Sequence, residues 1–547
     1  MFNNVLHSGV LTRSQRRAII NIIPKNLDST YITNFRPISL LCVDYKILSK
    51  LLSQRMKEIL CKIIYSKQFC AVKGRNINQC NMELRDVIVY ANQENLELAI
   101  LNLDWYKAFD TVSMEFVLKI LHKFGFGQMF INWIATLYNG IESTLSINNI
   151  HGDYFSVSRS VRQGCPLSMA LFIIYQEPFY RALSSSQIIR PLSIPGNIKL
   201  ILAGYADDTN VIVTDINSLL EISNIISDFE LATSSKLNRD KKTKIFGVGQ
   251  WRDRQQWPLD WLKTEEGYLY TLGIYHGNDY QATIEKNWSI ICNKTQSHIQ
   301  MLFNRRLSIF QRAANANSCI LSKVWYLSHI YPIAEPYSKE INRIVFGYVW
   351  CGKYEPIRRI DVCKPKCRGG LGLVNCEIKS KALLANSFLK SYCNEDNQNS
   401  LMIYFCFLKM NTVIPKLFSI HNASLISPVY YQKIMKICDK FLNVPTFPIL
   451  ESKKVYMTML KSEKSVVENL YPLSNWKIIW ANFCGFKIDP FDKDIIFKHL
   501  HVKLATNSKL AMMDLINSNT CNLCNDAIEQ TALHIIYECT YISPFYQ

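Results

Sequence analysis

The sequence has no long apolar run, no recognisable targeting segment and no low-complexity tract. Its longest apolar stretch, near Met169–Tyr175, is far shorter than the roughly 18 residues that a membrane-spanning helix needs. The amino-terminal residues do not combine a basic region with an apolar one, which is the pattern of a secretory signal peptide. These absences predict a protein that is neither secreted nor embedded in a membrane, so its 18 cysteines are expected to be reduced.

Acidic residues are the minority among the charges. The 547-residue chain has 44 Asp and Glu against 62 Lys and Arg, which gives a net charge of +18. Such an excess favours an anionic partner, either nucleic acid or an acidic membrane surface. Apolar residues make up 48% of the chain and charged residues 19%, which is the composition of a globular protein. The chain is long enough for several folded units, each with its own core.

The hydrophobic pattern predicts an α+β chain that is mixed in its first half and helical in the rest. Helical periodicity runs over residues 30–90. A buried strand is expected over Leu96–Asp104, and Ser113 is expected to cap a helix over Met114–Phe124. From about Ala282 onward the pattern is almost entirely helical. One mixed region followed by a helical region is typical of the α+β class.

Two adjacent acids, Asp207 and Asp208, stand at a turn between apolar strands. Side-by-side carboxylates repel each other unless a cation lies between them, and oxygen ligands of this kind suit Mg²⁺. A solvated turn is the plainer alternative. Asp104 ends the other buried strand, where an acid is costly unless it is paired or bound to metal. If the two strand ends meet, the three acids can hold two metal ions for in-line nucleotidyl transfer.

Three segments resemble motifs A, B and C of a reverse transcriptase. They are DWYKAFD at Asp104–Asp110, RQGCPLS at Arg162–Ser168 and YADD at Tyr205–Asp208. The wording is similar to that of the LINE-type (non-LTR) retrotransposon enzymes. The resemblance covers essentially the whole chain and implies a right-hand polymerase of fingers, palm and thumb, followed by a helical region and a small zinc knuckle. Further segments agree in order and spacing, at 34–41, 68–75, 237–241, 272–274 and 369–373.

The resemblance implies a role for each matching residue in catalysis. Asp104, Asp207 and Asp208 match the catalytic acids that bind two Mg²⁺ ions. Lys241 matches a lysine that protonates the departing pyrophosphate, although Lys242 beside it leaves this assignment open by one position.

The nucleotide-binding positions are implied in the same way. Lys73 and Arg75 match cations near the triphosphate, where a guanidinium fork suits phosphate oxygens. Phe109 matches the bulky residue that excludes ribonucleotides at the sugar 2′ position; standing alone it would be read as an ordinary core residue. Gln163 and Gly164 match the loop that packs on the incoming nucleotide, where glycine allows close approach of the backbone.

The implied partners are an RNA template, a DNA primer or target, dNTPs and the element's own RNA in a ribonucleoprotein of the nucleus and cytoplasm. Arg36 is expected to hold the template strand, with a surface salt bridge as the alternative. Because the chain begins about thirty residues before the first motif, we expect it to lack the endonuclease of full LINE-type polyproteins. The predicted divisions are 1–95 (fingers side), 96–278 (palm with interleaved fingers elements), 279–350 (helical thumb), 351–515 (basic connector and helical region) and 516–547 (CCHC zinc knuckle).

A cysteine–histidine cluster ends the chain. Cys521, Cys524, His534 and Cys539 are spaced as C-x2-C-x9-H-x4-C. Three thiolates and one imidazole can close a tetrahedral Zn²⁺ site, whereas an accidental cluster in a cysteine-rich chain is the alternative. The arrangement resembles the knuckle at the carboxyl end of LINE-type polyproteins, which implies contact with RNA.

The leading hypothesis is an RNA-directed DNA polymerase that extends a DNA 3′-OH on an RNA template. An intron-type or domesticated host reverse transcriptase is one alternative, against which the 369–373 segment and the terminal knuckle speak. The other is a catalytically silent nucleic-acid-binding remnant of a truncated retroelement copy, whose binding would depend on salt through phosphate contacts. The three intact acids favour the enzyme.

Overall fold

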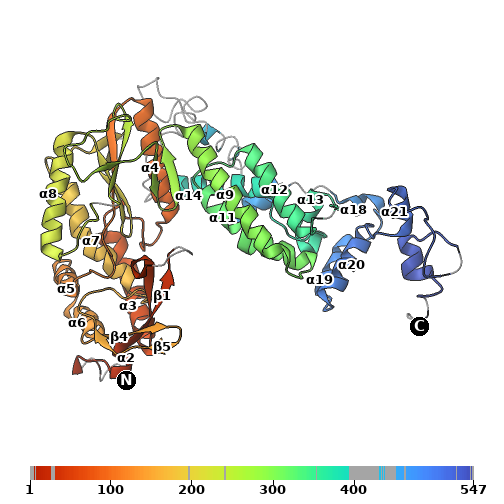
Figure 1. The fold of residues 1–547 in the computed structure, drawn as a ribbon, viewed down its shortest axis with the longest axis horizontal. Coiled ribbons are helices and arrows are strands. Elements are labelled where there is room, and N and C mark those ends of the chain that lie inside the picture. The colour runs from red at the N-terminus through yellow and green to blue at the C-terminus, as the bar shows by residue number, and fades with distance from the viewer. Residues whose placement is uncertain are drawn as a thin grey trace. The chain divides into compact units, whose positions relative to one another are not determined.

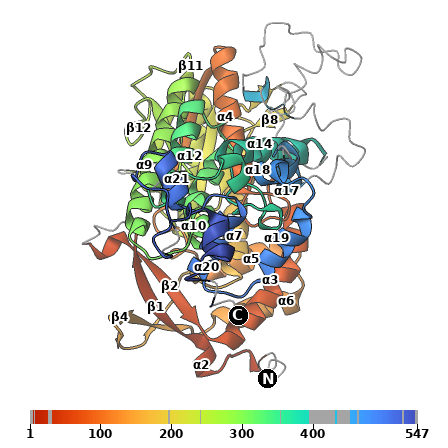
Figure 2. The ribbon, with the colours of Figure 1, turned by 90° about the vertical axis from the view of Figure 1, so that its right-hand side faces the viewer.

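The computed structural model describes residues 5, 8–25, 31–194, 198–239, 242–352, 354–393, 430–432, 434, 437, 451–460, 464–524, 527–542 and 544. The chain forms two compact units, one of Met1–Thr283 with Ser391–Met435 and one of Ile284–Lys390 with Lys436–Gln547. The first unit mixes helices and strands, and the second is helical in its described part (Figures 1 and 2). This confirms the predicted α+β class. Among the described helices, none is both long and apolar enough to cross a membrane.

The first unit is built on two sheets with helices packed against them. Its elements are α2 (Arg13–Arg16), β1 (Arg17–Pro24), β2 (Phe35–Leu41), α3 (Val43–Ile63), α4 (Ile77–Gln93), β3 (Glu97–Leu103), α5 (Met114–Lys123), α6 (Gln128–Tyr138), β4 (Glu142–Ile147), β5 (Ile150–His151), β6 (Phe155–Ser156), α7 (Ser168–Ser185), β7 (Leu192–Ile194), β8 (Ile198–Leu200), β9 (Leu202–Tyr205), β10 (Asp208–Val213), α8 (Ile216–Thr233), β11 (Lys244–Gly249), β12 (Lys263–Thr264), β13 (Tyr268–Thr271) and β14 (Ile274–Gly277).

The central sheet has the strand order β12-β11-β3-β10-β9. Strand β3 lies in the middle and is antiparallel to both β10 and β11. Helix α8 packs on β10 and on α7, while α4 packs beside β9 and β11. Residues 98–101 are therefore all buried, which explains why this strand reads as a continuous apolar run rather than as an alternating one. The predicted strand over Leu96–Asp104 is confirmed.

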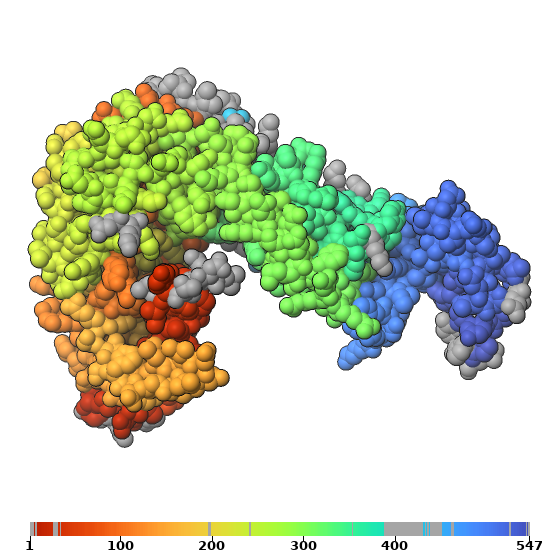
Figure 3. Space-filling view, viewed as in Figure 1, coloured from red at the N-terminus to blue at the C-terminus, as the bar shows by residue number. Residues whose placement is uncertain are grey.

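The second sheet has the order β2-β1-β4-β5, with β6 also paired to β4. Strands β1 and β2 and the β4–β5 hairpin lie side by side in the first unit, in the red and orange parts of Figure 3. Strand β1 is antiparallel to β2 and parallel to β4. Pro37, which lacks a backbone N–H, is tolerated in β2 because this strand lies at the edge of the sheet.

The helical prediction for residues 30–90 is wrong at its beginning. Residues 35–41 form strand β2, because pairing with β1 overrides the local pattern. Helices α3 and α4 occupy the rest of that range, apart from the segment between them. Within α3, Leu48, Leu52 and Met56 are buried, whereas Ile47 and Leu51 are 58% and 47% exposed. The helical spacing was therefore recognisable in the sequence, but the apolar residues of α3 are shared between a core face and a solvent face.

The predicted cap of α5 is confirmed. The Ser113 side chain accepts a hydrogen bond from the backbone N–H of Phe116, and the helix runs from Met114 to Lys123. This bond satisfies one of the amide groups that the first turn leaves without a helical partner. Gly125 follows the helix with φ +77°, a conformation that favours glycine.

The second unit consists of short and medium helices in its described part. They are α9 (Tyr280–Phe303, whose first turn belongs to the first unit), α10 (Ile309–Asn315), α11 (Ser322–Ser328), α12 (Glu335–Val349), α13 (Arg359–Val362), α14 (Cys376–Cys393, whose last residues from Ser391 on belong to the first unit), α17 (Ser452–Met459), α18 (Val466–Leu470), α19 (Trp476–Gly485), α20 (Pro490–Leu500) and α21 (Asn507–Met512), followed by a π-helical turn at His534–Glu538.

The glycine-rich segment 369–373 packs beneath α19. Gly369 has φ +75°, and a Cβ at this position would collide with the ring of Trp480. The ring nitrogen Nε2 of His501 donates a hydrogen bond of 2.8 Å to the Gly369 carbonyl. This segment therefore packs together with α19 and with the end of α20.

Candidate active site and metal centre

The register of the central sheet brings the predicted carboxylates to one edge. Strand β10 pairs with β3 so that Thr209 lies opposite Leu103, and Asp104 directly follows β3 where Asp208 begins β10. Strands β9 and β10 pair Tyr205 with Asp208, which leaves Ala206 and Asp207 as a two-residue hairpin turn. Two segments that are about a hundred residues apart in the sequence thus present their acids at the same place.

Burial and the mutual repulsion of these acids both act on their pKa values. Burial, together with the charges of Asp207 and Asp104, raises the pKa of Asp208 to about 6. Burial also raises the pKa of Asp207 and the charge of Asp104 adds to this, while the charges of Arg36 and Lys242 oppose it. Clustered, partly buried carboxylates that repel one another are a donor set that fits a hard divalent cation such as Mg²⁺.

Asn238 and Lys242, which both follow α8, hold Asp104 in place. The backbone N–H of Asn238 donates to the Asp104 carbonyl at 2.8 Å, and its side-chain Nδ2 donates to Asp104 Oδ2 at 3.1 Å. Lys242 Nζ lies 3.6 Å from Asp104 Oδ1. Lys241, the predicted proton donor, lies outside the described residues. The role of Asn238 was missed from the sequence, although the residue stands within the 237–241 motif.

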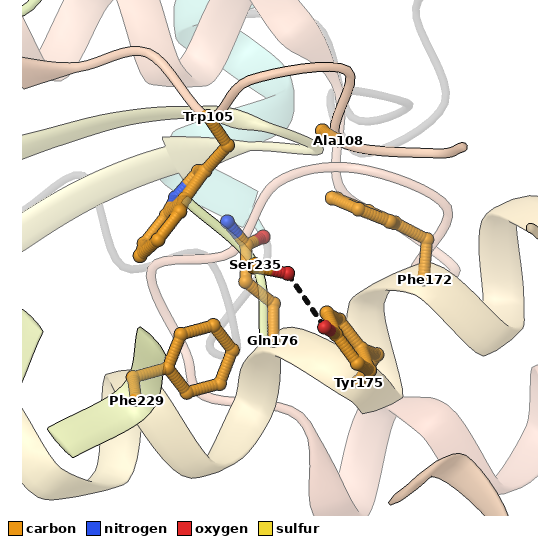
Figure 4. A pocket seen from close by; sticks show the side chains of 7 residues that line it. All are labelled: Trp105, Ala108, Phe172, Tyr175, Gln176, Phe229 and Ser235. Atoms are coloured by element: carbon orange, nitrogen blue, oxygen red, sulfur yellow. Dashed lines mark hydrogen bonds between the residues drawn. The ribbon is translucent and has the colours of Figure 1, made fainter. Parts of the chain in front are cut away.

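The side chain of Phe109 packs on helix α7 of the first unit. Its half-buried ring stacks on Phe172 of α7, with centroids 4.4 Å apart and an interplanar angle of 20°. Figure 4 shows Phe172 at the wall of a small cavity, where Tyr175 and Ser235 share a hydrogen bond of 2.6 Å. The packing of α7 therefore determines where the Phe109 ring lies.

The predicted nucleotide loop is held between strand β2 of the second sheet and the segment that follows β3. Gly164 has φ +111°, and a Cβ there would lie 2.6 Å from the Ser39 carbonyl oxygen. The Ser39 N–H donates to the Gln163 carbonyl at 2.7 Å. The side chain of Gln163 donates to Asp110 Oδ1 at 3.5 Å. Glycine is needed at position 164 both for its backbone conformation and for this close approach.

The predicted fingers cations differ in their surroundings. Arg75 Nη1 donates to the carbonyls of Tyr65 and Gln68 at 2.7 and 2.8 Å, and burial lowers its pKa. Lys73 is exposed and pairs with Glu58 at 3.0 Å. Arg36 is also exposed, yet it lies close enough to lower the pKa of Asp207. The structure therefore brings Arg36 toward the acids, whereas the nucleotide contacts of Lys73 and Arg75 stay predictions.

The four predicted zinc ligands converge in the structure. The ligand atoms of Cys521, Cys524, His534 and Cys539 lie within 4.8 Å of one another, and all four residues are buried. His534 Nε2 is 3.3 Å from Cys524 Sγ, and the sulfurs of Cys521 and Cys539 are 4.0 Å apart. Three thiols and one imidazole at this separation fit a tetrahedral Zn²⁺ ion.

Hydrogen bonds to sulfur prepare this cluster for a metal. The Leu523 N–H and the Gln530 side-chain amide donate to Cys521 Sγ at 3.4 and 3.7 Å. Although burial raises the pKa of Cys521, these donors and the Cys524 N–H outweigh it and bring the pKa to about 6. Donors of this kind stabilise the thiolate, which is the form that binds zinc.

The Asp208→Asn variant tests the cost of ionising Asp208, which is buried beside two other acids. Because the folded protein raises the pKa of Asp208 from 3.8 to about 6, ionisation of this group destabilises the fold. The penalty is absent below about pH 4, grows as the pH rises to about 6 and is complete above that. Without metal, the variant should be more stable than the wild type by about 1–2 kcal/mol at pH 7.5, after allowance for partial solvent screening.

Thermal unfolding from pH 4 to 8 in EDTA measures this difference. Added Mg²⁺ should stabilise the wild type more than the variant. A variant that is less stable than the wild type at pH 7.5 without metal would contradict this cost of ionising Asp208.

The Cys521→Ser variant tests the terminal cluster. Loss of one thiolate should release bound zinc, because three remaining ligands hold the ion much more weakly. Zinc per chain, measured by elemental analysis after gel filtration, should fall from about one to near zero. Cys484→Ser is the matched control, since Cys484 is an exposed thiol of α19 outside the cluster. Equal zinc content in both variants would refute the site.

Two family models match this chain. One is described as reverse transcriptase (RNA-dependent DNA polymerase) and matches residues 23–265. The other is described as zinc-binding in reverse transcriptase and matches residues 451–545. The first match contains the carboxylate edge and the 162–168 loop, and the second contains the cysteine–histidine cluster.

Two similar proteins, both from transposable elements, agree with these family matches. The chain is 29% identical over 368 residues to the Transposon TX1 uncharacterized 149 kDa protein of Xenopus laevis, which covers 67% of this chain and 28% of that protein. It is 27% identical over 388 residues to the Retrovirus-related Pol polyprotein from type-2 retrotransposable element R2DM of Drosophila melanogaster, which covers 68% and 35%. The matched part is therefore about a third or less of these relatives' length.

Among solved structures, the chain is similar to apo telomerase from Candida tropicalis, with a TM-score of 0.41 and 12% identity over 77% of this chain and 70% of that one. The match over 23–265 and the sheet that carries the three acids agree with the right-hand polymerase fold expected from the motifs. The family models identify a reverse transcriptase domain at residues 23–265 and a reverse-transcriptase zinc-binding region at residues 451–545, and the similarity to two transposable-element proteins agrees with the LINE-type resemblance of the motifs.

Proposed function

We propose that this chain is an RNA-directed DNA polymerase that extends a DNA 3′-OH on an RNA template, using dNTPs and two Mg²⁺ ions. The observation that carries the proposal is the meeting of Asp104, Asp207 and Asp208 at one edge of the central sheet. The raised pKa of Asp208 supports it, because carboxylates that repel one another are stabilised by a shared cation.

The three acids would hold the metal ions from two strands. When bound there, Mg²⁺ lowers the pKa of the attacking 3′-OH and stabilises the leaving pyrophosphate. Asn238 keeps the Asp104 carboxylate oriented toward the shared edge. We assign the protonation of the pyrophosphate to the pair Lys241 and Lys242, and the position of Lys242 beside Asp104 favours Lys242.

The surrounding residues are proposed to select and align the substrates. Phe109, held against α7, would exclude a sugar 2′-OH, and the Gln163–Gly164 loop would pack on the incoming nucleotide. Arg36 would contact the template strand near the acids. Lys73 is exposed and can exchange Glu58 for a triphosphate, whereas Arg75 would first have to leave two backbone carbonyls.

We propose the following wider organisation for the chain. The excess of positive charge suits an RNA template and a DNA primer or target, and the terminal cluster would add contacts to the element's RNA within a ribonucleoprotein of the nucleus and cytoplasm. The divisions proposed are 1–95 for the fingers side, 96–278 for the palm, 279–350 for the thumb, 351–515 for the connector and helical region, and 516–547 for the knuckle.

Primer extension by the full chain and by Asp207→Asn tests the catalytic proposal. On a poly(A) template with an oligo(dT) primer, dTTP and Mg²⁺, the variant should lose about 10³-fold or more of the extension rate, equivalent to about 4 kcal/mol of transition-state stabilisation. Its affinity for the primer–template should change little, because nucleic-acid binding relies on phosphate contacts away from this carboxylate.

Extension that persists in the variant would refute the metal site. Salt-sensitive binding of the duplex with no extension by the wild type would instead support a silent nucleic-acid-binding remnant.

The Phe109→Ala variant tests sugar selection. Removal of the ring should raise the ribonucleotide-to-deoxyribonucleotide ratio of kcat/KM by about tenfold or more, since a factor of ten corresponds to only about 1.4 kcal/mol of steric exclusion. Phe116→Ala is the matched control: Phe116 is also half-buried and packs on Tyr175 of the same helix α7, but it comes from α5. A ratio that is unchanged in Phe109→Ala, or raised equally in Phe116→Ala, would show that Phe109 only contributes to packing.

A further inference from the structure

The buried side chain of Gln68 reaches the turn that carries two of the acids. Gln68 lies between α3 and α4 and is 1% exposed. Its Oε1 accepts hydrogen bonds from the N–H groups of Ala206 and Cys70, at 3.1 and 2.9 Å. Its Nε2 donates to the Ala206 carbonyl and to the Tyr180 hydroxyl, both at 3.3 Å. One amide thus engages both backbone polar groups of Ala206, directly before Asp207.

The turn needs such support. Ala206 has φ +54°, in the left-handed region, which costs a residue with a Cβ about 1 kcal/mol. A positive φ at the first of two turn residues is what a tight hairpin between twisted strands requires. Repulsion between Asp207 and Asp208 further disfavours this conformation when no cation is present. The clamp on Ala206 therefore offsets two unfavourable contributions at the same turn.

The segment that carries Gln68 is itself fixed to β9. The Gly204 N–H donates to the Lys67 carbonyl at 2.9 Å, and the Phe69 N–H donates to the Gly204 carbonyl at 2.8 Å. A Cβ at Gly204 would collide with the Tyr180 hydroxyl, so glycine permits the close approach of the tyrosine that Gln68 also contacts. Residues 67–69 therefore pair with β9 through a single parallel bridge, between Gln68 and Gly204.

The same segment is anchored from its other side. Arg75 Nη1 donates to the Gln68 carbonyl at 2.8 Å. Lys67 forms an ion pair of 2.5 Å with Glu83 of α4, and both side chains are buried. A buried ion pair of this kind is costly to separate, because either charge would remain without its partner. These contacts hold the backbone of Gln68, so that its amide has a fixed position from which to act on the turn.

We propose that Gln68 is a positioning residue for the metal-binding turn, whose amide sets the direction in which Asp207 and Asp208 present their oxygens. The inference rests on the proposed two-metal function. Gln68 contacts neither carboxylate in the described structure: it acts through Ala206, the first residue of the turn. Its loss should weaken metal binding while leaving nucleic-acid binding intact.

Binding of Mn²⁺ to the zinc-loaded full chain, measured from the electron paramagnetic resonance signal of free Mn²⁺, tests the proposal without relying on catalysis. Gln68→Met keeps the length of the side chain and removes its hydrogen bonds, so its Mn²⁺ affinity should fall about tenfold, which is about 1.4 kcal/mol. Gln68→Glu keeps the acceptor for the Ala206 N–H and should lose less, about threefold. The primer–template affinity should stay unchanged in both variants.

Gln79→Met is the matched control. Gln79 is also a buried glutamine of this region, but its side chain accepts from the Asn76 N–H at the start of α4. It should lower the melting temperature without changing Mn²⁺ affinity. If Gln68→Met bound Mn²⁺ as tightly as the wild type, or if Gln79→Met lost as much Mn²⁺ affinity, Gln68 would be a packing residue only. If Mn²⁺ binding by the wild type did not depend on Asp207, the proposed function itself would be overturned, and the inference with it.

Discussion

The antiparallel pairing of β3 with β10 decides where the three acids lie. Side chains alternate between the two faces of a strand, so a slip of one residue would exchange the faces of β10 and give each buried side chain different neighbours. Strand β3 is buried on both faces and is paired on both edges, which leaves it a single register. The place at which Asp104 meets Asp208 is therefore a consequence of hydrophobic packing, and no attraction between the acids is needed.

The acids impose a cost that the surrounding residues reduce without removing. Lys242 and Asn238 contact Asp104, and the charge of Arg36 reaches Asp207. None of these contacts neutralises Asp208, whose pKa stays near 6. A site that keeps part of its repulsion without a cation gains more when one binds, which is the usual arrangement where stability is exchanged for function.

Features encoded in short segments were predictable from the sequence. The strand before Asp104, the cap at Ser113 and the convergence of the terminal cysteines and histidine all agree with the structure. Strand β2 was not predictable, because its pairing with β1 is not contained in its own pattern. The carbonyl contacts of Arg75 and the clamp of Gln68 on the turn were not predictable for a similar reason. A motif specifies which residue occurs, whereas backbone groups from elsewhere decide what it touches.

The central position of β3 also constrains how the protein is made. Its two neighbours, β10 and β11, are encoded more than about a hundred residues later, so both edges of this apolar strand form non-local pairs. At ribosomal rates of about 5–20 residues per second, β3 waits roughly 5–20 seconds for its first partner. During that time the strand Glu97–Leu103 is an unpaired apolar segment of the kind that chaperones cover. The carboxylate edge therefore forms only after β10 has been synthesised.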